Sequence, residues 1–254
     1  MRESSGMTLV ELKLNERPSP NNDARAPDAT VDTLVLHYTG MKSAEAALER
    51  LCDPESNVSA HYLIDEEGKI SRLVPELRRA WHAGVSSWAG ESDINDRSIG
   101  IELANPGHEF GYRPFSEPQM GALEQLAGDI LSRYDIPARR VLGHSDIAPS
   151  RKQDPGEFFD WRRLARKSIG VWPEVLAQPR QGATLGPGDS GMTVGELQSA
   201  LAAFGYGISP TGDYDTQTTD VVLAFQRHFR PRVVDGAYDP ESESILRALL
   251  RMVM

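Results

Sequence analysis

Cysteine, long apolar runs and excess positive charge are all scarce in this chain of 254 residues. Its single cysteine, Cys52, excludes an internal disulfide bond and any cysteine-rich metal site. No apolar run approaches the length of a membrane-spanning helix, and residues 1–27 contain no apolar stretch typical of a signal peptide. The formal net charge of −10 argues against nucleic acid as a partner, because phosphate binding needs a basic face. We therefore expect a cytoplasmic protein; a periplasmic or exported one is the alternative if a leader has been removed.

The composition is typical of a soluble globular protein, with 39% hydrophobic and 25% charged residues. The length suits one large domain, or one medium domain plus a small one. Composition changes at Pro173, after which glycine and proline become frequent. We predict an irregular N-terminal arm, a catalytic domain, a linker and a small helical domain, at residues 1–29, 30–173, 174–186 and 187–254.

Strand and helix patterns alternate in the larger domain. Apolar and β-branched runs predict strands at 31–37, 59–65, 69–74, 98–103 and 140–142. Amphipathic patterns predict helices from Ser43 to Pro54, from 116 to 134 and from 161 to 167. Strands interleaved with helices indicate an α/β domain, with one sheet packed on helices.

The C-terminal part carries three amphipathic patterns, at 194–204, 221–229 and 245–249. Similar turns, Gly212-Asp213-Tyr214-Asp215 and Gly236-Ala237-Tyr238-Asp239, precede the second and third patterns. Asp239 followed by Pro240 is typical of a helix start. We predict a three-helix bundle with an internal repeat and no catalytic set, and interpret it as a binding module. Its removal is expected to spare cleavage of small substrates.

The segment 143–156 holds several ionisable side chains between glycines and prolines. This pattern predicts a loop of defined conformation. His144 and Asp154 offer a nitrogen and an oxygen ligand suited to zinc. Lys152 lies two residues before Asp154, on the same side of an extended chain. We expect Asp146 to hold the loop by accepting backbone N–H groups. A polar surface loop with a hydrogen-bonded histidine is the alternative.

Two more polar residues stand at the ends of predicted strands, His37 and Glu102. The ends of the strands in one sheet lie close together. Two imidazoles and a carboxylate can therefore line one cleft, together with a separate glutamate. Two histidines and one carboxylate leave a fourth tetrahedral position for water, the pattern of catalytic zinc sites. Glu102 can then move a proton from water to a leaving amine. Lys152 can stabilise an oxyanion in the transition state.

Each assignment has a simpler alternative. His37 as a strand cap and Glu102 pointing to solvent from an edge strand both fit the sequence. An ionised carboxylate in an apolar strand is costly unless it is paired or functional, which favours the catalytic interpretation of Glu102. His61 and His82 are rival ligands, for which we favour positions behind the ligands or in the substrate wall. His108 and His228 are expected at the surface.

Five sequence blocks together resemble the zinc-dependent N-acetylmuramoyl-L-alanine amidases of the amidase-2 class, related in fold to peptidoglycan recognition proteins and a phage lysozyme. The blocks are Leu36-His37-Tyr38-Thr39, residues 58–64, Ala80-Trp81-His82-Ala83-Gly84, residues 98–102 and residues 143–156. The resemblance implies a central mixed β-sheet flanked by helices and one Zn²⁺ per chain. It places the metal ligands at His37, His144 and Asp154, the catalytic acid at Glu102 and the oxyanion-stabilising lysine at Lys152.

Residues 186–252 resemble a peptidoglycan-binding three-helix domain, through Gly188-Asp189-Ser190-Gly191 and Phe225-Gln226-Arg227 among other features. The two resemblances imply hydrolysis of the amide between N-acetylmuramic acid, including its 1,6-anhydro form, and L-alanine, in cell-wall recycling or remodelling. Peptidoglycan fragments or muropeptides would be the partners. Candidates for substrate contact are Trp81, His82, His61, Asn105, Arg72 and Arg151, with Arg79 and Arg97 as further cations.

Two other functional classes compete with hydrolysis by a zinc amidase. A peptidoglycan recognition protein that binds without cutting is the main rival, but non-catalytic relatives lose a metal ligand that this sequence keeps. A metal-dependent esterase or phosphatase would need more cations and usually two metals. No oligomeric state follows from the sequence.

Overall fold

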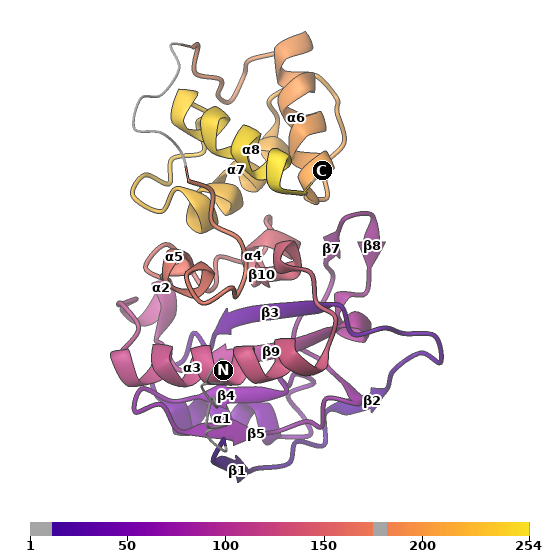
Figure 1. Cartoon of the computed structure of the whole chain (residues 1–254), viewed down its shortest axis with the longest axis vertical. Coiled ribbons are helices and arrows are strands. Elements are labelled where there is room, and N and C mark those ends of the chain that lie inside the picture. Colours follow the sequence, from indigo (N-terminus) through magenta and orange to yellow (C-terminus); the bar gives the residue numbers. More distant parts are fainter. Residues whose placement is uncertain (1–11, 175–181, 254) are drawn as a thin grey trace, which may run out of the picture.

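The computed structural model describes residues 12–174 and 182–253 and contains a six-stranded mixed sheet (Figure 1). The strand order is β1-β5-β4-β9-β3-β10, and β4–β5 is the antiparallel pair in an otherwise parallel sheet. The strands are β1 (Leu14–Glu16), β3 (Thr33–Tyr38), β4 (Tyr62–Ile64), β5 (Ile70–Arg72), β9 (Ser98–Leu103) and β10 (Val141–Gly143). The predicted mixed α/β architecture is confirmed.

Helices cover both faces of this sheet, and the alternation of side chains along each strand decides which residues they bury. On one face, α3 (Glu117–Arg133) packs on Leu34, Leu36 and Ile101. On the other face, α1 (Ala44–Cys52) packs near β4 and β5. Ser43 and Ser116 cap these helices as predicted, because their side chains accept backbone N–H groups of the first turn.

Short elements complete the larger domain: α2 (Gly107–Phe110), α4 (His144–Ile147), α5 (Trp161–Ala165), η1 (Ile94–Arg97), η2 (Ala138–Arg140), β2 (Asn22–Ala24), β6 (Arg78–Ala80), β7 (Ser87–Trp88) and β8 (Glu91–Ser92). The prediction of irregular structure was wrong for β1 and β2, which pair with β5 and β6. The β7–β8 hairpin lies in a stretch for which the sequence predicted no strand. These strands are too short to show a periodic pattern in the sequence.

The C-terminal module contains α6 (Met192–Phe204), α7 (Thr216–Phe229) and α8 (Pro240–Val253). The predicted three helices are confirmed. Asp215 caps α7, and Asp239 accepts from the backbone N–H of Ser242 at 2.9 Å, with Pro240 at the first helical position. The linker predicted at 174–186 lies partly outside the described residues.

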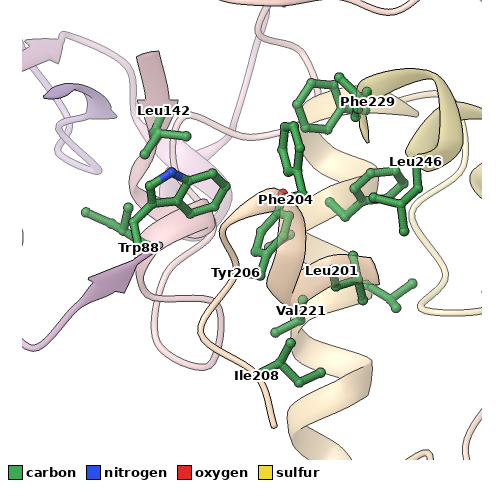
Figure 2. Close-up of a cluster of buried hydrophobic side chains, with 14 of the residues drawn as sticks. Trp88, Leu142, Leu201, Phe204, Tyr206, Ile208, Val221, Phe229 and Leu246 are labelled. Atoms are coloured by element: carbon green, nitrogen blue, oxygen red, sulfur yellow. The ribbon is translucent and has the colours of Figure 1, made fainter. Parts of the chain in front are cut away.

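The module packs directly on the larger domain, above β10, α4 and α5 (Figure 1). One buried apolar cluster contains Trp88 and Leu142 of the larger domain together with Phe204 and Tyr206 of the module (Figure 2). The two parts therefore share a hydrophobic core. Among residues 12–174 and 182–253, no helix combines the length and the apolar content needed to cross a membrane.

Candidate metal centre and catalytic cleft

Strand register brings the sequence-predicted residues together. His37 of β3 and Glu102 of β9 are direct partners across neighbouring parallel strands. Their neighbours Leu36 and Ile101 point to the α3 face, so His37 and Glu102 share the opposite face. β10 lies beside β3 on its other side and ends at Gly143, which delivers His144 next to His37.

Three donor atoms converge at this point. Nδ1 of His37 lies 2.9 Å from Nδ1 of His144, and Oδ2 of Asp154 lies 3.1 and 3.0 Å from these two nitrogens. All three residues are buried, and together they form a group able to hold a metal ion. Ligands at zinc-bond length around a tetrahedral ion lie about 3.3 Å apart, so this cluster is close to the spacing of a metal site.

The outer ring nitrogens support the same interpretation. Nε2 of His144 lies 3.1 Å from the carbonyl oxygen of Ala83, so Nε2 carries the proton and leaves a lone pair on Nδ1. Nε2 of His37 lies 3.0 Å from Nδ1 of His82, whose Nε2 lies 3.1 Å from Oγ of Ser98. Ser98 in turn donates to the carbonyl of Ile94 at 2.6 Å. Such outer contacts fix the tautomer of a metal-binding histidine.

Charges in the cluster favour cation binding. Burial and the charge of His144 lower the pKa of His37 to about 4, so its imidazole is neutral at pH 7. Burial alone would raise the pKa of Asp154, but its interactions with His144 and His37 lower this pKa well below its usual value. A neutral imidazole at His37 and an ionised carboxylate at Asp154 are protonation states that metal ligands require.

The loop that carries these ligands is held by its own backbone. It begins with the short helix α4 and not with the irregular structure that we predicted. Oδ2 of Asp146 accepts from the N–H of Gly143 at 2.8 Å, which confirms the structural role predicted for this carboxylate. The N–H of Ser145 donates to the carbonyl of Asp154 at 2.9 Å and ties the two ends of the loop together.

A cavity of about 740 Å³ opens beside the cluster, and its walls include Trp81, His82, Glu102, Arg151 and Lys152. Oε2 of Glu102 and Nε1 of Trp81 are buried and have no hydrogen-bond partner among the described residues. Burial and the nearby Asp154 carboxylate raise the pKa of Glu102 well above its usual value, and Lys152 opposes this rise. Arg151 donates to the carbonyl of Ala83 at 3.2 Å.

Several sequence-predicted substrate contacts lie outside the cavity. His61 is fully buried and bonds to the N–H of Gly100 and the carbonyl of Arg78. Asn105 is also buried and braces its loop through the carbonyl of Arg113. Arg72 is exposed on β5 and pairs with Glu16. The two further cations are likewise engaged elsewhere, Arg79 with Asp23 and Asp93, and Arg97 with Asp32 and Glu91.

Other residues line the cavity without having been predicted there. Tyr38 and Arg50 belong to its wall, and so does His108, which is exposed as predicted. The Tyr38 hydroxyl lies 2.9 Å from Nδ1 of His108. Tyr38 follows His37 directly in the sequence, and this position next to a predicted ligand could have indicated that it lines the cavity. His228, also predicted at the surface, is buried at the contact between the two parts of the chain.

Comparison with known proteins agrees with this geometry. The family described as N-acetylmuramoyl-L-alanine amidase (Amidase_2) matches residues 27–157, and a peptidoglycan binding domain family (PG_binding_1) matches residues 190–246. N-acetylmuramoyl-L-alanine amidase AmiD of Escherichia coli is 39% identical over 239 residues, which cover 89% of this chain and 85% of AmiD.

Two solved structures are similar along most of their length. One is AmiD from Escherichia coli with the substrate anhydro-N-acetylmuramic acid-L-Ala-D-γ-Glu-L-Lys, with a TM-score of 0.76, 38% identity and coverage of 90% of this chain and 92% of that chain. The other is AmpDh3 from Pseudomonas aeruginosa with anhydromuramic pentapeptide, with a TM-score of 0.77, 37% identity and coverage of 90% and 94%.

Proposed function

Because the chain belongs to the N-acetylmuramoyl-L-alanine amidase family, we propose that it hydrolyses its substrate with a zinc ion held by His37, His144 and Asp154. The bond cleaved is the amide between N-acetylmuramic acid and L-alanine. The observation that carries the zinc assignment is the convergence of three possible ligand atoms, from His37, His144 and Asp154. The outer nitrogen Nε2 of each histidine is already engaged by an acceptor. Zinc, when bound, lowers the pKa of a water molecule and polarises a carbonyl group.

Glu102 moves the proton in this proposal. It stands beside His37 in the sheet, lines the cavity and keeps one buried oxygen without a hydrogen-bond partner among residues 12–174 and 182–253. Its carboxylate takes a proton from the attacking water, the water oxygen bonds to the amide carbon, and the carbon–nitrogen bond breaks. The proton then passes to the leaving nitrogen of L-alanine. The raised pKa of Glu102 suits a group that must both accept and return a proton.

Lys152 stabilises the negative charge that develops on the amide oxygen. Its side chain lines the cavity close to Asp154 and forms no hydrogen bond or ion pair with any residue that the structure describes. An ammonium group already in place when charge develops contributes about 3 kcal/mol to the transition state.

The substrate in this proposal is a muropeptide, including the 1,6-anhydro form found in the complexes of both similar structures. The cavity offers Trp81 for a sugar or amide group and the cations Arg50 and Arg151 for the anionic stem peptide. The chain also carries a peptidoglycan-binding domain, which supports action on polymer or its fragments. Recycling and remodelling of the cell wall are both compatible with this site.

Mass spectrometry of products from a purified anhydro-muropeptide tests the function. The zinc-loaded protein should release free stem peptide, and removal of zinc with a chelator should stop the reaction. Glu102→Gln should still bind one zinc ion but lose turnover by about 10²–10⁴-fold, the usual contribution of a general acid–base group. The exposed Glu49→Gln on α1 is the matched control and should retain full turnover.

Binding without cleavage remains the rival hypothesis, and the same experiment separates the two. Intact muropeptide after incubation with zinc-loaded protein would support a recognition protein. Full activity of Glu102→Gln would instead leave hydrolysis standing and refute the role of this carboxylate.

A further inference from the structure

The carboxylate of Asp146 lies at the junction between the metal-site loop and the C-terminal module. Asp146 is completely buried and stands two residues after His144, within the same short helix α4. Its Oδ2 accepts from the N–H of Gly143 at 2.8 Å, on the strand end that leads into His144. A buried carboxylate needs several donors, and one backbone N–H does not suffice.

The remaining donors come from the module. The hydroxyl of Tyr206 donates to Oδ1 of Asp146 at 2.8 Å, and Nδ1 of His228 donates to Oδ2 at 2.7 Å. Both side chains are buried, and Nε2 of His228 has no hydrogen-bond partner in the described part of the chain. Burial and the Asp146 carboxylate raise the pKa of Tyr206 well above its usual value, so the phenol keeps its proton and remains a donor.

Ring stacking fixes the position of His228. Its imidazole stacks on Trp161 of α5 with ring centroids 3.7 Å apart and on Phe229 at 3.8 Å. Trp161 belongs to the larger domain and also lies against Gly143, since a Cβ placed on that glycine would be 3.3 Å from the indole. The module therefore contacts the metal-site loop through a packed and hydrogen-bonded junction.

We infer that Tyr206 and His228 are positioning residues of the metal site, which act through Asp146 on the loop that carries His144. This inference rests on the zinc site of the proposed function. The module thus helps to set the geometry of the metal ligands, in addition to any contact it makes with peptidoglycan. Neither residue touches the proposed metal ligands directly; their effect passes through the Asp146 carboxylate and the backbone of Gly143.

The zinc dissociation constant, measured by chelator competition on the full chain, tests the inference. Tyr206→Phe removes one hydroxyl and leaves a buried carboxylate short of a donor. We expect zinc binding to weaken about tenfold, the lower end of the effect of outer contacts on metal affinity. Tyr214→Phe is the matched control, because the buried hydroxyl of Tyr214 donates at 2.6 Å to the carbonyl of Gly236, remote from Asp146. It should destabilise the module and leave zinc affinity unchanged.

Two substitutions of His228 separate hydrogen bonding from packing. His228→Phe keeps an aromatic ring between Trp161 and Phe229 but removes the donor, whereas His228→Asn keeps an N–H donor near Nδ1 but removes the ring. Zinc affinity should fall in the Phe variant and recover in the Asn variant, whatever their melting temperatures.

Other outcomes refute either the positioning role or the proposed metal site. Zinc affinity that follows melting temperature across all four variants, or that equals the wild-type value in Tyr206→Phe, refutes the positioning role. A wild-type chain that binds no zinc refutes the proposed metal site itself, which is a different result.

Discussion

At the scale of a single residue, His61 shows how backbone contacts decide protonation. Its Nδ1 accepts from the N–H of Gly100 at 3.0 Å, and this leaves the ring proton on Nε2, which donates to the carbonyl of Arg78 at 3.0 Å. A second proton on Nδ1 would face the N–H of Gly100. Burial and the positive charge of Arg25 act in the same direction and lower the pKa of His61 to about 3.

This lowered pKa predicts a loss of stability in acid. The pKa of His61 in the folded chain lies below the ordinary value of 6.5, so the unfolded chain takes up the proton first as the pH falls. The contribution of neutral His61 to the free energy of unfolding is complete above about pH 6.5 and is lost progressively as the pH falls to about 3. For this one group the free energy of unfolding should fall by up to about 1.4 kcal/mol per pH unit.

Denaturant unfolding of the metal-free chain at a series of pH values measures the effect. His61→Asn keeps an acceptor for the N–H of Gly100 but cannot be protonated in this range. The variant should be less stable at neutral pH and show a shallower pH dependence than the wild type. Parallel curves for the two proteins would contradict the prediction.

Side-chain roles were predictable from the sequence where chemistry and position agreed. His37, Glu102 and His144 stand at or near the ends of apolar strands, where a polar residue is costly without a function. His61 also lies next to a strand, but its sequence does not say which face it occupies. The structure turns it inward, away from the cavity wall. The face of the sheet to which a side chain points depends on the register of its strand, and a single sequence gives little information about register.

At the scale of elements, strand β9 approaches the ring of His82 so closely that only glycine fits at position 100. A Cβ added to Gly100 would lie 2.5 Å from Cγ of His82. His82 in turn contacts Nε2 of His37 at 3.0 Å, so the missing side chain of Gly100 makes room for the residue behind a proposed metal ligand. The close packing of β9 against residues 80–84 therefore affects the position of a residue next to the proposed metal site.

Gly100→Ala should therefore displace His82 and weaken zinc binding. We expect a loss of about 1–3 kcal/mol in stability from overpacking, together with a lower zinc affinity. Gly121→Ala in α3 is the control, because no described atom outside the neighbouring residues and the adjacent helix backbone lies within 4 Å of its added Cβ. That change should stabilise the chain by about 0.5–1 kcal/mol, as alanine does in a helix interior. Equal zinc affinity in both variants would contradict the role of the close approach.

Elements with long periodic patterns were predicted well, and short ones were not. The helices at 117–133 and 216–229 carry both an amphipathic stripe and a side-chain cap. Strands β1 and β2 have three residues each and are held by pairing with distant strands, which local sequence does not encode. The helical turn α4 was missed because glycines and prolines surround it.

At the scale of the whole molecule, the catalytic part and the helical module share one core, although their sequences suggested separate units. Trp88 in the β7–β8 hairpin is 1% exposed, and its ring lies 4.9 Å from Tyr206 and 5.8 Å from Phe204 (Figure 2). The N–H of Ala89 also donates to the carbonyl of Gly205 at 2.7 Å. The sequence could not reveal this contact, because both partners look like ordinary core residues of their own domains.

The shared core changes what we expect from removal of the module. The sequence suggested that cleavage of small substrates would survive this deletion. In the structure, Trp88, Leu142 and Ile147 share a buried cluster with the module, and the module supplies two donors to Asp146. Deletion should therefore remove part of this core together with both donors. Point substitutions in the full chain therefore test the coupling between the two parts more cleanly than truncation does.

Trp88→Ala should uncouple the two parts. The wild-type chain is expected to unfold in one calorimetric transition, because separating the parts exposes a shared core. Removing the indole should lower stability by about 3–5 kcal/mol, through lost burial and the cavity that it leaves. The module and the α/β domain should then melt in two resolved transitions, because the remaining junction at Asp146 and Trp161 links them less strongly.

Leu123→Ala is the matched control for this experiment. Leu123 is fully buried between α3 and the sheet, remote from the module, so its removal should cost about 2–5 kcal/mol within the α/β domain alone. That variant should melt at a lower temperature but still in a single transition, because the contact at Trp88 is intact. If Trp88→Ala also unfolds in one transition, or if the wild type already shows two, the contact at Trp88 does not couple the parts.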